Sequence, residues 1–171
     1  PEAVFRASVK ELQRLGGMRE DVARRIRERR FTADPEREMH RVHQLGARVL
    51  TFRDAAYPVA LRRIRRPPMV LYVKGGRLPV HQDQVAVVGS RSPTPYGLKT
   101  AKSLAADLGR CGIGTVSGMA RGIDTAAHWG ALDTDGGTVA VLGTGIDRIY
   151  PRSNGKLFER IVEKGAVVTE F

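Results

Sequence analysis

The sequence has a single cysteine, Cys111, among its 171 residues. One thiol cannot form an intrachain disulfide or a multi-thiolate zinc site, so we expect no structural zinc and a reducing compartment, the cytoplasm. We also expect no other bound metal and no cofactor. Long apolar runs are also absent, and none of those present approaches the roughly 20 residues that a membrane-spanning helix requires. The sequence therefore predicts a soluble protein without membrane insertion.

Acidic residues are scarce relative to basic ones, since 18 Asp and Glu stand against 29 Lys and Arg and the formal net charge is +11. A charge of this sign attracts polyanions, of which nucleic acid is the first candidate. An arginine-rich proteome could produce the same surface without any anion partner, and this alternative stays open. The length and the 42% apolar fraction fit one α/β domain with a small appendage.

The basic residues concentrate at the front of the chain, where residues 1–66 hold 17 of them and only 9 acidic ones. The spacing of Val4, Val9 and Leu12 predicts a first helix that Gly16 and Gly17 end, and residues 20–30 predict a second. We interpret residues 1–31 as a small helical module. Its arginine-rich second helix is typical of a solvated outer face, although a DNA-contacting helix is the alternative.

A second unit, residues 32–171, begins where Asp34-Pro35 predicts a helix start, and that helix ends at Gly46. Two extended segments follow, and then strands alternate with helices to the end of the chain. This alternation predicts a mostly parallel sheet. The expected strands are 48–52, 69–73, 85–88, 113–117, 138–142 and 166–169, and the expected helices between the last four are 95–111, 123–132 and 153–164.

Three glycine-containing loops follow three of these strands. In a parallel sheet with right-handed crossovers, such loops emerge together at the carboxyl edge of the strands, where ligands bind. Small residues, free backbone N–H groups and helix N-termini there favour a phosphate, although glycine can also serve only to make the turns tight. The candidate residues are Gly89, Ser90 and Arg91, then Ser117, Gly118, Arg121 and Gly122, then Gly143, Thr144 and Gly145, with Arg152 following the third loop.

Two nucleotide-binding fingerprints are missing from these loops. The dinucleotide pattern G-x-G-x-x-G would need a third glycine where Arg148 stands, and no loop carries the Gly-Lys-Ser/Thr ending of a phosphate-binding NTPase loop. Asp124 and His128 lie one helical turn apart and could form an acid–base pair. The alternative is structural, with Asp124 holding orphan amides and His128 acting as its hydrogen-bond partner.

Three aromatic residues lie near the loops, Tyr96, Trp129 and Tyr150, and each could stack on an exposed base. Trp129 lies inside an expected helix, which favours packing. For Tyr150, stacking and packing are equally supported.

Three long motifs resemble the DNA-processing protein A family of bacteria, also called DprA or Smf. They are VAVVGSRSPTPYG, TVSGMARGIDTAAHWGAL and TVAVLGTGIDRIYPRSN, and they lie within residues 85–155. The preceding PPMVLYVKGG is similar to the family's opening strand, and residues 1–31 resemble its SAM-like helical domain.

The resemblance implies an extended Rossmann-like fold that binds single-stranded DNA and hands it to the RecA recombinase during natural transformation, without catalysis. It implies that Arg91 contacts the DNA backbone and that Arg152 takes the place of a family basic residue. Gly89, Ser90, Ser117, Gly118 and Gly122 would shape the pocket.

The family continues beyond a glutamate–aromatic pair, matched here by Glu170-Phe171, into a further loop and an arginine-asparagine-arginine motif that this sequence lacks. We therefore expect the remaining strands and much of the dimerisation surface to be missing, and a homodimer only for the full-length family member. The rival hypothesis is a nucleotide-binding enzyme of the related phosphoribohydrolase type. Its glycine-threonine loop is followed by a glutamate, which Gly143-Thr144-Gly145 lacks.

Overall fold

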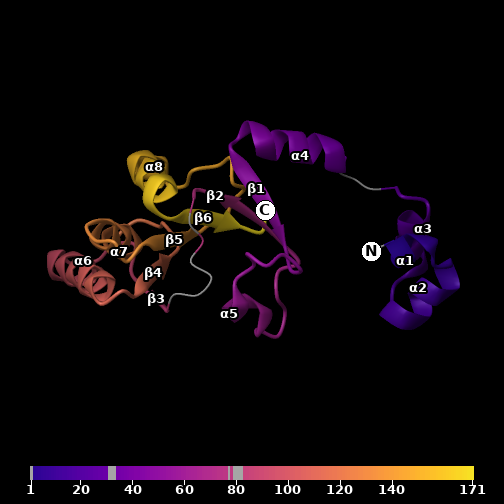
Figure 1. The fold of residues 1–171 in the computed structure, drawn as a ribbon, viewed down its shortest axis with the longest axis horizontal. Coiled ribbons are helices and arrows are strands. Elements are labelled where there is room, and N and C mark those ends of the chain that lie inside the picture. Colours follow the sequence, from indigo (N-terminus) through magenta and orange to yellow (C-terminus); the bar gives the residue numbers. More distant parts are fainter. Residues whose placement is uncertain (1, 31–33, 77, 79–82) are drawn as a thin grey trace. The chain divides into compact units, whose positions relative to one another are not determined.

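The computed structural model describes residues 2–30, 34–76, 78 and 83–171 (Figure 1). The chain divides into two compact units, residues 1–41 and residues 42–171. The boundary predicted at residues 31–32 lies outside the described residues and stays a prediction.

The first unit begins with three short helices, α1 (Glu2–Arg6), α2 (Val9–Gly16) and α3 (Glu20–Arg27). The prediction of one helix before Gly16 is wrong, because a capping box separates α1 from α2. The Glu11 amide donates to the Ser8 hydroxyl at 3.3 Å, and the Ser8 amide donates to the Glu11 carboxylate at 2.8 Å. Gly17, with φ of +58°, ends α2 as predicted.

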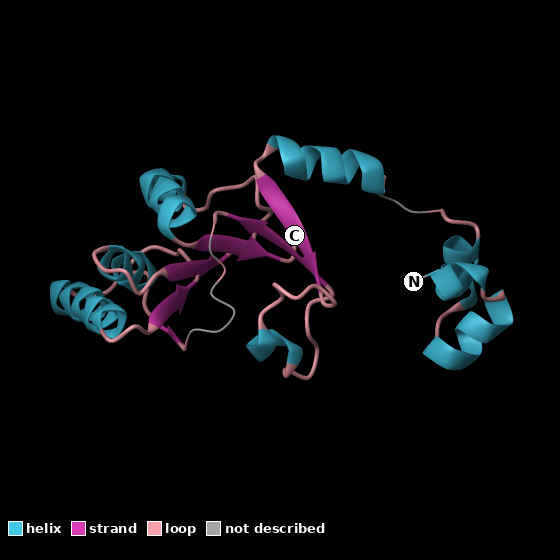
Figure 2. Cartoon of the chain, in the orientation of Figure 1, coloured by secondary structure: helices cyan, strands magenta, loops and turns pink. Residues whose placement is uncertain are grey.

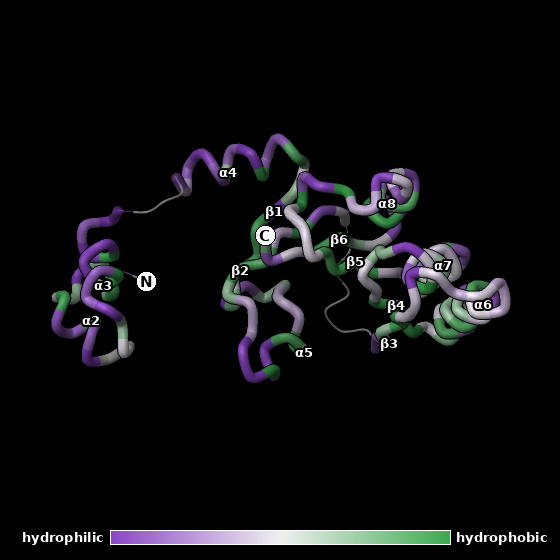
Figure 3. Tube along the Cα trace, turned by 180° about the vertical axis from the view of Figure 1, so that it is seen from behind, coloured by the Kyte–Doolittle hydropathy of each residue, from purple (hydrophilic) through white to green (hydrophobic). Residues whose placement is uncertain are grey.

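Several arginines of α3 and its end contact their own unit. Arg24 pairs with Glu20 at 2.8 Å, Arg27 donates to the Phe5 carbonyl at 3.2 Å, and the Arg29 guanidinium lies 5.4 Å from the centre of the Phe5 ring. Figure 3 shows this helix as largely hydrophilic along its length. These contacts favour the interpretation of α3 as a solvated outer face.

The second unit is built on a six-stranded sheet with the order β1-β2-β6-β5-β4-β3 (Figure 2). The strands are β1 (Ala47–Thr51), β2 (Val70–Lys74), β3 (Gln84–Ala86), β4 (Gly114–Ser117), β5 (Thr138–Val141) and β6 (Ala166–Thr169). Neighbours from β3 to β6 pair in parallel, whereas β2 pairs antiparallel with both β1 and β6. The predicted α/β fold with a mostly parallel sheet, preceded by helices, is confirmed.

Helix α4 (Pro35–Gln44) begins as predicted at Asp34, whose carboxylate accepts from the amides of Glu36 at 3.0 Å and Arg37 at 3.4 Å. The crossover helices are α6 (Pro95–Arg110), α7 (Ile123–Leu132) and α8 (Gly155–Lys164), the last preceded by a 3₁₀ turn at Arg152–Asn154. Helix α5 (Val59–Arg62) lies between β1 and β2 and was not predicted. Its four residues are too few for a periodic pattern to reveal.

Side chains of β5 and β6 divide between two cores because neighbouring residues of a strand point to opposite faces. Ala140 and Val167 pack with Leu157, Phe158 and Ile161 of α8. Val139 and Val168 pack instead with Tyr57 and Leu61, which belong to the segment between β1 and β2. Helix α8 therefore covers one face of the sheet, and this connecting segment covers part of the other. Within the described residues, no helix is long and apolar enough to cross a membrane.

Candidate functional site

The first two glycine loops are joined by one buried carboxylate. Asp124, in the first turn of α7, accepts from the amides of Gly118 at 3.2 Å, Ala120 at 3.4 Å and Gly89 at 3.4 Å. Gly89 lies in the loop after β3, and Gly118 and Ala120 lie in the loop after β4. The carboxylate therefore bonds to both loops. The expectation that these amides are free for an anion is wrong, because Asp124 already occupies them.

Gly122 holds the same two loops against each other. The Ile123 amide donates to the Ser90 carbonyl at 3.1 Å. A Cβ atom at Gly122 would lie 2.3 Å from the Ser90 oxygen and 2.8 Å from Cδ of Pro93, and the φ of Gly122 is +83°. Only glycine fits this close approach at this backbone conformation. Gly122 therefore serves to make a tight turn, which is the structural alternative given above for the loop glycines.

His128 is buried and bonds to a strand, not to Asp124. Its Nδ1 lies 2.7 Å from the Thr138 hydroxyl, which itself donates to the Thr115 carbonyl at 2.9 Å. Because that hydroxyl uses its only proton, it accepts from Nδ1–H. The predicted hydrogen bond between His128 and Asp124 is wrong, and both side chains are engaged structurally.

Burial lowers the pKa of His128 to about 4, although the Asp124 charge and a hydrogen bond at Ser117 act to raise it. The ring is therefore neutral at pH 7. Its tautomer is set by the bond to Thr138.

We expect the second unit to lose stability as the pH falls from 6.5 towards 4. Above 6.5 the imidazole is neutral in both states, and between these values only the unfolded chain binds the proton. Each pH unit in this range lowers the free energy of unfolding by about 1.4 kcal/mol, and the whole range lowers it by about 3 kcal/mol. An NMR titration of the His128 ring checks the cause, and a midpoint at or above 6.5 would contradict it.

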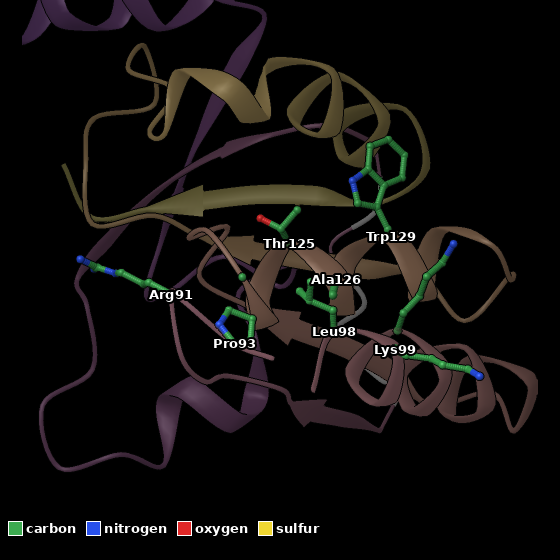
Figure 4. Close-up of a pocket in the computed structure, with 9 residues that line it drawn as sticks. Arg91, Pro93, Leu98, Lys99, Thr125, Ala126 and Trp129 are labelled. Atoms are coloured by element: carbon green, nitrogen blue, oxygen red, sulfur yellow. The ribbon is translucent and has the colours of Figure 1, made fainter. Parts of the chain in front are cut away.

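The first two loops border a hollow of about 560 Å³ on the α6–α7 side of the unit (Figure 4). Trp129 is half-buried and packs against the core, as predicted, and the rest of its surface faces this hollow. Arg91 and Lys99 extend in opposite directions from the hollow (Figure 4). The lining residues are Arg91, Pro93, Leu98, Lys99, Lys102, Gly122, Thr125, Ala126 and Trp129.

The third loop forms a separate hollow of about 670 Å³, lined by Thr144, Asp147, Arg148, Ile149, Tyr150 and Arg152. The Thr144 hydroxyl donates to the Arg148 carbonyl and the Thr169 hydroxyl donates to the Thr144 carbonyl, each at 2.8 Å. Asn154 links this region to the second loop, because its amide group donates to the Met119 carbonyl at 2.9 Å. The three loops therefore share an edge of the sheet, and neither of these two hollows is lined by all three of them.

Three of the predicted residues are exposed arginines, Arg91, Arg121 and Arg152. None of them forms an ion pair within the part of the chain that the structure describes. Arg121 lines neither hollow as far as the described residues show. The loop amides of Gly89, Gly118 and Ala120 are occupied by Asp124, whereas these three guanidinium groups can donate to an anion.

The other predicted residues are mainly structural. Ser117 is buried and its hydroxyl donates to the Val87 carbonyl at 2.7 Å, which joins β4 to the residue after β3. A Cβ atom at Gly145 would lie 2.7 Å from the Asp147 carboxylate, whereas one at Gly143 would meet no described atom within 4 Å.

Sequence reasoning missed two cationic residues of the first hollow, Lys99 and Lys102, and one of the second, Arg148. The signal for the lysines was their spacing of three on α6, which places both on one helix face. Lys102 is paired with Asp133 at 3.0 Å. No group of three or more His, Cys, Asp or Glu side chains that could hold a metal occurs among the described residues.

Comparison with known proteins finds relatives that all belong to one family. The family model of DNA recombination-mediator protein A matches residues 48–171. The Smf protein of Synechocystis is 35% identical over 175 residues, which cover 99% of this chain and 44% of that protein. The DNA processing protein DprA of Streptococcus pneumoniae is 40% identical over 118 residues, which cover 69% of this chain and 42% of that protein.

Two solved structures are similar to this one. The X-ray structure of DprA from Streptococcus pneumoniae has a TM-score of 0.80 and 33% identity, over 96% of this chain and 56% of that chain. A structure of DNA processing protein A from Helicobacter pylori, described for its single-stranded DNA binding mode, has a TM-score of 0.64 and 31% identity. The match covers 72% of this chain and 56% of that chain. The chain thus spans about half the length of these relatives.

Proposed function

The chain belongs to the family of DNA recombination-mediator protein A, and from this we propose that it binds single-stranded DNA as part of DNA processing in natural transformation. The observation that carries the proposal is the set of exposed arginines without ion-pair partners among the described residues, at the carboxyl edge of a parallel sheet. Phosphate groups of a DNA backbone fit these donors.

Within this proposal, Arg91 contacts the backbone from the first loop, and Arg121 and Arg152 contribute from the second and third. The glycines and serines of the predicted site set the shape of the loops, as Gly122 and Ser117 illustrate. The first hollow, beside the first two loops, and the second hollow, at the third loop, give a single strand room to bind. Tyr150, which is 62% exposed beside Arg152, is placed to stack on a base.

The finer parts of the proposal concern the whole protein. We propose that the bound strand is passed to RecA, that the full-length protein is a homodimer, and that it acts in the cytoplasm. We also propose that it is not an enzyme, because the bonds of Asp124 and His128 keep them from acting as an acid–base pair. Release of free base from nucleoside monophosphates would instead support the phosphoribohydrolase alternative.

The direct test compares binding to labelled oligo-dT with binding to a duplex of equal length. We expect tighter binding to the single strand, because unstacked bases and a flexible backbone can follow the loops. Equal affinity for both would leave only general attraction between a basic protein and a polyanion.

Removing residues 1–31 tests whether this module, proposed here as a SAM-like domain, contacts DNA. We expect the slope of log affinity against log salt to stay nearly unchanged, because the slope counts neutralised phosphates and the α3 arginines contact their own unit. Binding is measured at several salt concentrations. A slope that drops by more than about 1 would show that the module binds DNA.

A further inference from the structure

The segment between β1 and β2, residues 52–69, lies at the same edge of the sheet as the glycine loops. Strand β2 is antiparallel to β6, with Tyr72 opposite Thr169, so β2 begins where β6 ends. The Phe52 amide donates to the Met69 carbonyl at 3.0 Å and closes the two ends of the segment. We call residues 52–69 the arginine connector.

The arginine connector contains five arginines and one acidic residue, Asp54. That carboxylate is already bonded, because it accepts from the Thr51 amide at 2.5 Å and from the Thr51 hydroxyl at 2.9 Å. The five arginines are Arg53, Arg62, Arg63, Arg65 and Arg66. The charge of this segment is therefore strongly positive.

One arginine and one tyrosine hold the connector in a defined conformation. The Arg62 guanidinium donates to the Asp54 carbonyl at 2.5 Å and lies 5.8 Å from the ring centres of Phe52 and Tyr57. Tyr57 is fully buried, and its hydroxyl donates to the Pro68 carbonyl at 2.7 Å. The remaining arginines thus project from an anchored segment, which lowers the entropy lost when they bind a ligand.

Arg53, Arg63, Arg65 and Arg66 are exposed, and none forms an ion pair within the described ranges of the chain. Like charges so close in sequence repel each other unless a polyanion neutralises them. Exposed apolar side chains accompany the arginines: Ile64, 47% exposed, separates Arg63 from Arg65, and Met69, 66% exposed, follows the proline pair. Alternating charge and apolar surface suits a chain of phosphates and bases.

The connector is also close enough to the glycine loops to share one ligand. In the sheet order, β2 is three strands away from β4 and four from β3. Strands lie about 4.8 Å apart, so the start of β2, where the connector ends, is about 14 to 19 Å across the sheet from the strands that lead into the first two loops. A few nucleotides span this distance, well within the roughly 4 to 16 nucleotides that single-stranded DNA-binding domains cover.

We propose that the arginine connector is a second phosphate-binding surface on which the same DNA strand continues after the glycine loops. The proposal rests on the proposed function, since it extends that binding path. Arg65 and Arg66 lie beside the proline pair that leads into β2 and supply two of its phosphate contacts.

The test is the double variant Arg65→Gln/Arg66→Gln in the full chain, titrated with oligo-dT of about 15 nucleotides at several salt concentrations. We expect affinity to fall about tenfold or more and the log–log salt slope to shrink by about 1.4, because two phosphate contacts to a single strand are lost. The matched control is Arg110→Gln/Arg160→Gln. It removes the same charge from α6 and α8, where each arginine is paired with an acidic residue on its own helix.

The outcomes separate the two proposals. If the connector variant binds like the control while Arg91→Ala still loses affinity, the connector proposal is wrong and the proposed function stands. The connector would then be a candidate surface for an acidic protein. If the wild-type protein does not bind oligo-dT, both proposals are overturned. Equal losses of affinity in the connector variant and the control would show that only the net charge of the protein matters, and would overturn the connector's role as a contact.

Discussion

Replacing Arg91 by alanine is expected to weaken single-stranded DNA binding by about one to two orders of magnitude at moderate salt. A charge-assisted contact to phosphate contributes about 1.5 to 3 kcal/mol. Arg91 is exposed and forms no ion pair among the described residues. Its guanidinium therefore does not have to give up an existing ion pair before it binds a phosphate. The log–log salt slope should also shrink by about 0.7.

The loss should be similar for all base sequences, because a phosphate contact reads no base. The fold should survive, since the loop position of Arg91 is held by the Ser90 carbonyl and Gly89 amide rather than by the arginine side chain. Titration of the folded variant with oligo-dT at several salt concentrations measures both effects. Arg110→Ala is the control, because Arg110 ends α6 and pairs with Asp107. Wild-type affinity with an unchanged slope would eliminate Arg91 as a contact.

Gly122→Ala should destabilise the second unit by about 3 kcal/mol or more and lower its Tm by about 10 °C. The added Cβ would lie 2.3 Å from the Ser90 oxygen, and the φ of +83° is unfavourable for any side chain. Relief of this overlap must separate the first two loops. That movement displaces Arg91, so DNA affinity should fall along with stability.

Gly143→Ala is the matched control within the same predicted site. Gly143 lacks a positive φ, and nothing among the described residues lies within 4 Å of a Cβ built there. We expect its stability to change by less than about 0.5 kcal/mol. Thermal unfolding of both variants makes the comparison. Equal melting temperatures for the two variants would show that the contact between the first and second loops does not stabilise the unit.

Much of the fold could be predicted from the sequence because its signals are local. Apolar runs such as residues 85–88 and 138–142 mark strands, and an N-cap with proline marks the start of α4. The right-handed crossover rule then places the loops containing Gly89, Gly118 and Gly143 at one edge without any coordinates. The Ser8-x-x-Glu11 capping box was equally local, but the apolar spacing continued across it and hid the break.

Only the tertiary structure decided how those loops are used. The sequence places Asp124 in a first helical turn, but its bond to Gly89 depends on the pairing of β3 with β4. His128 bonds to Thr138 of the next strand, and not to Asp124 one turn earlier on the helix, because α7 packs against β5. The arginine connector lies at the same sheet edge as the glycine loops because β2 pairs with β6, which lies far along the chain. Local patterns determine which elements form, whereas pairings between distant elements depend on how the whole core packs, and they decide which groups remain free to bind.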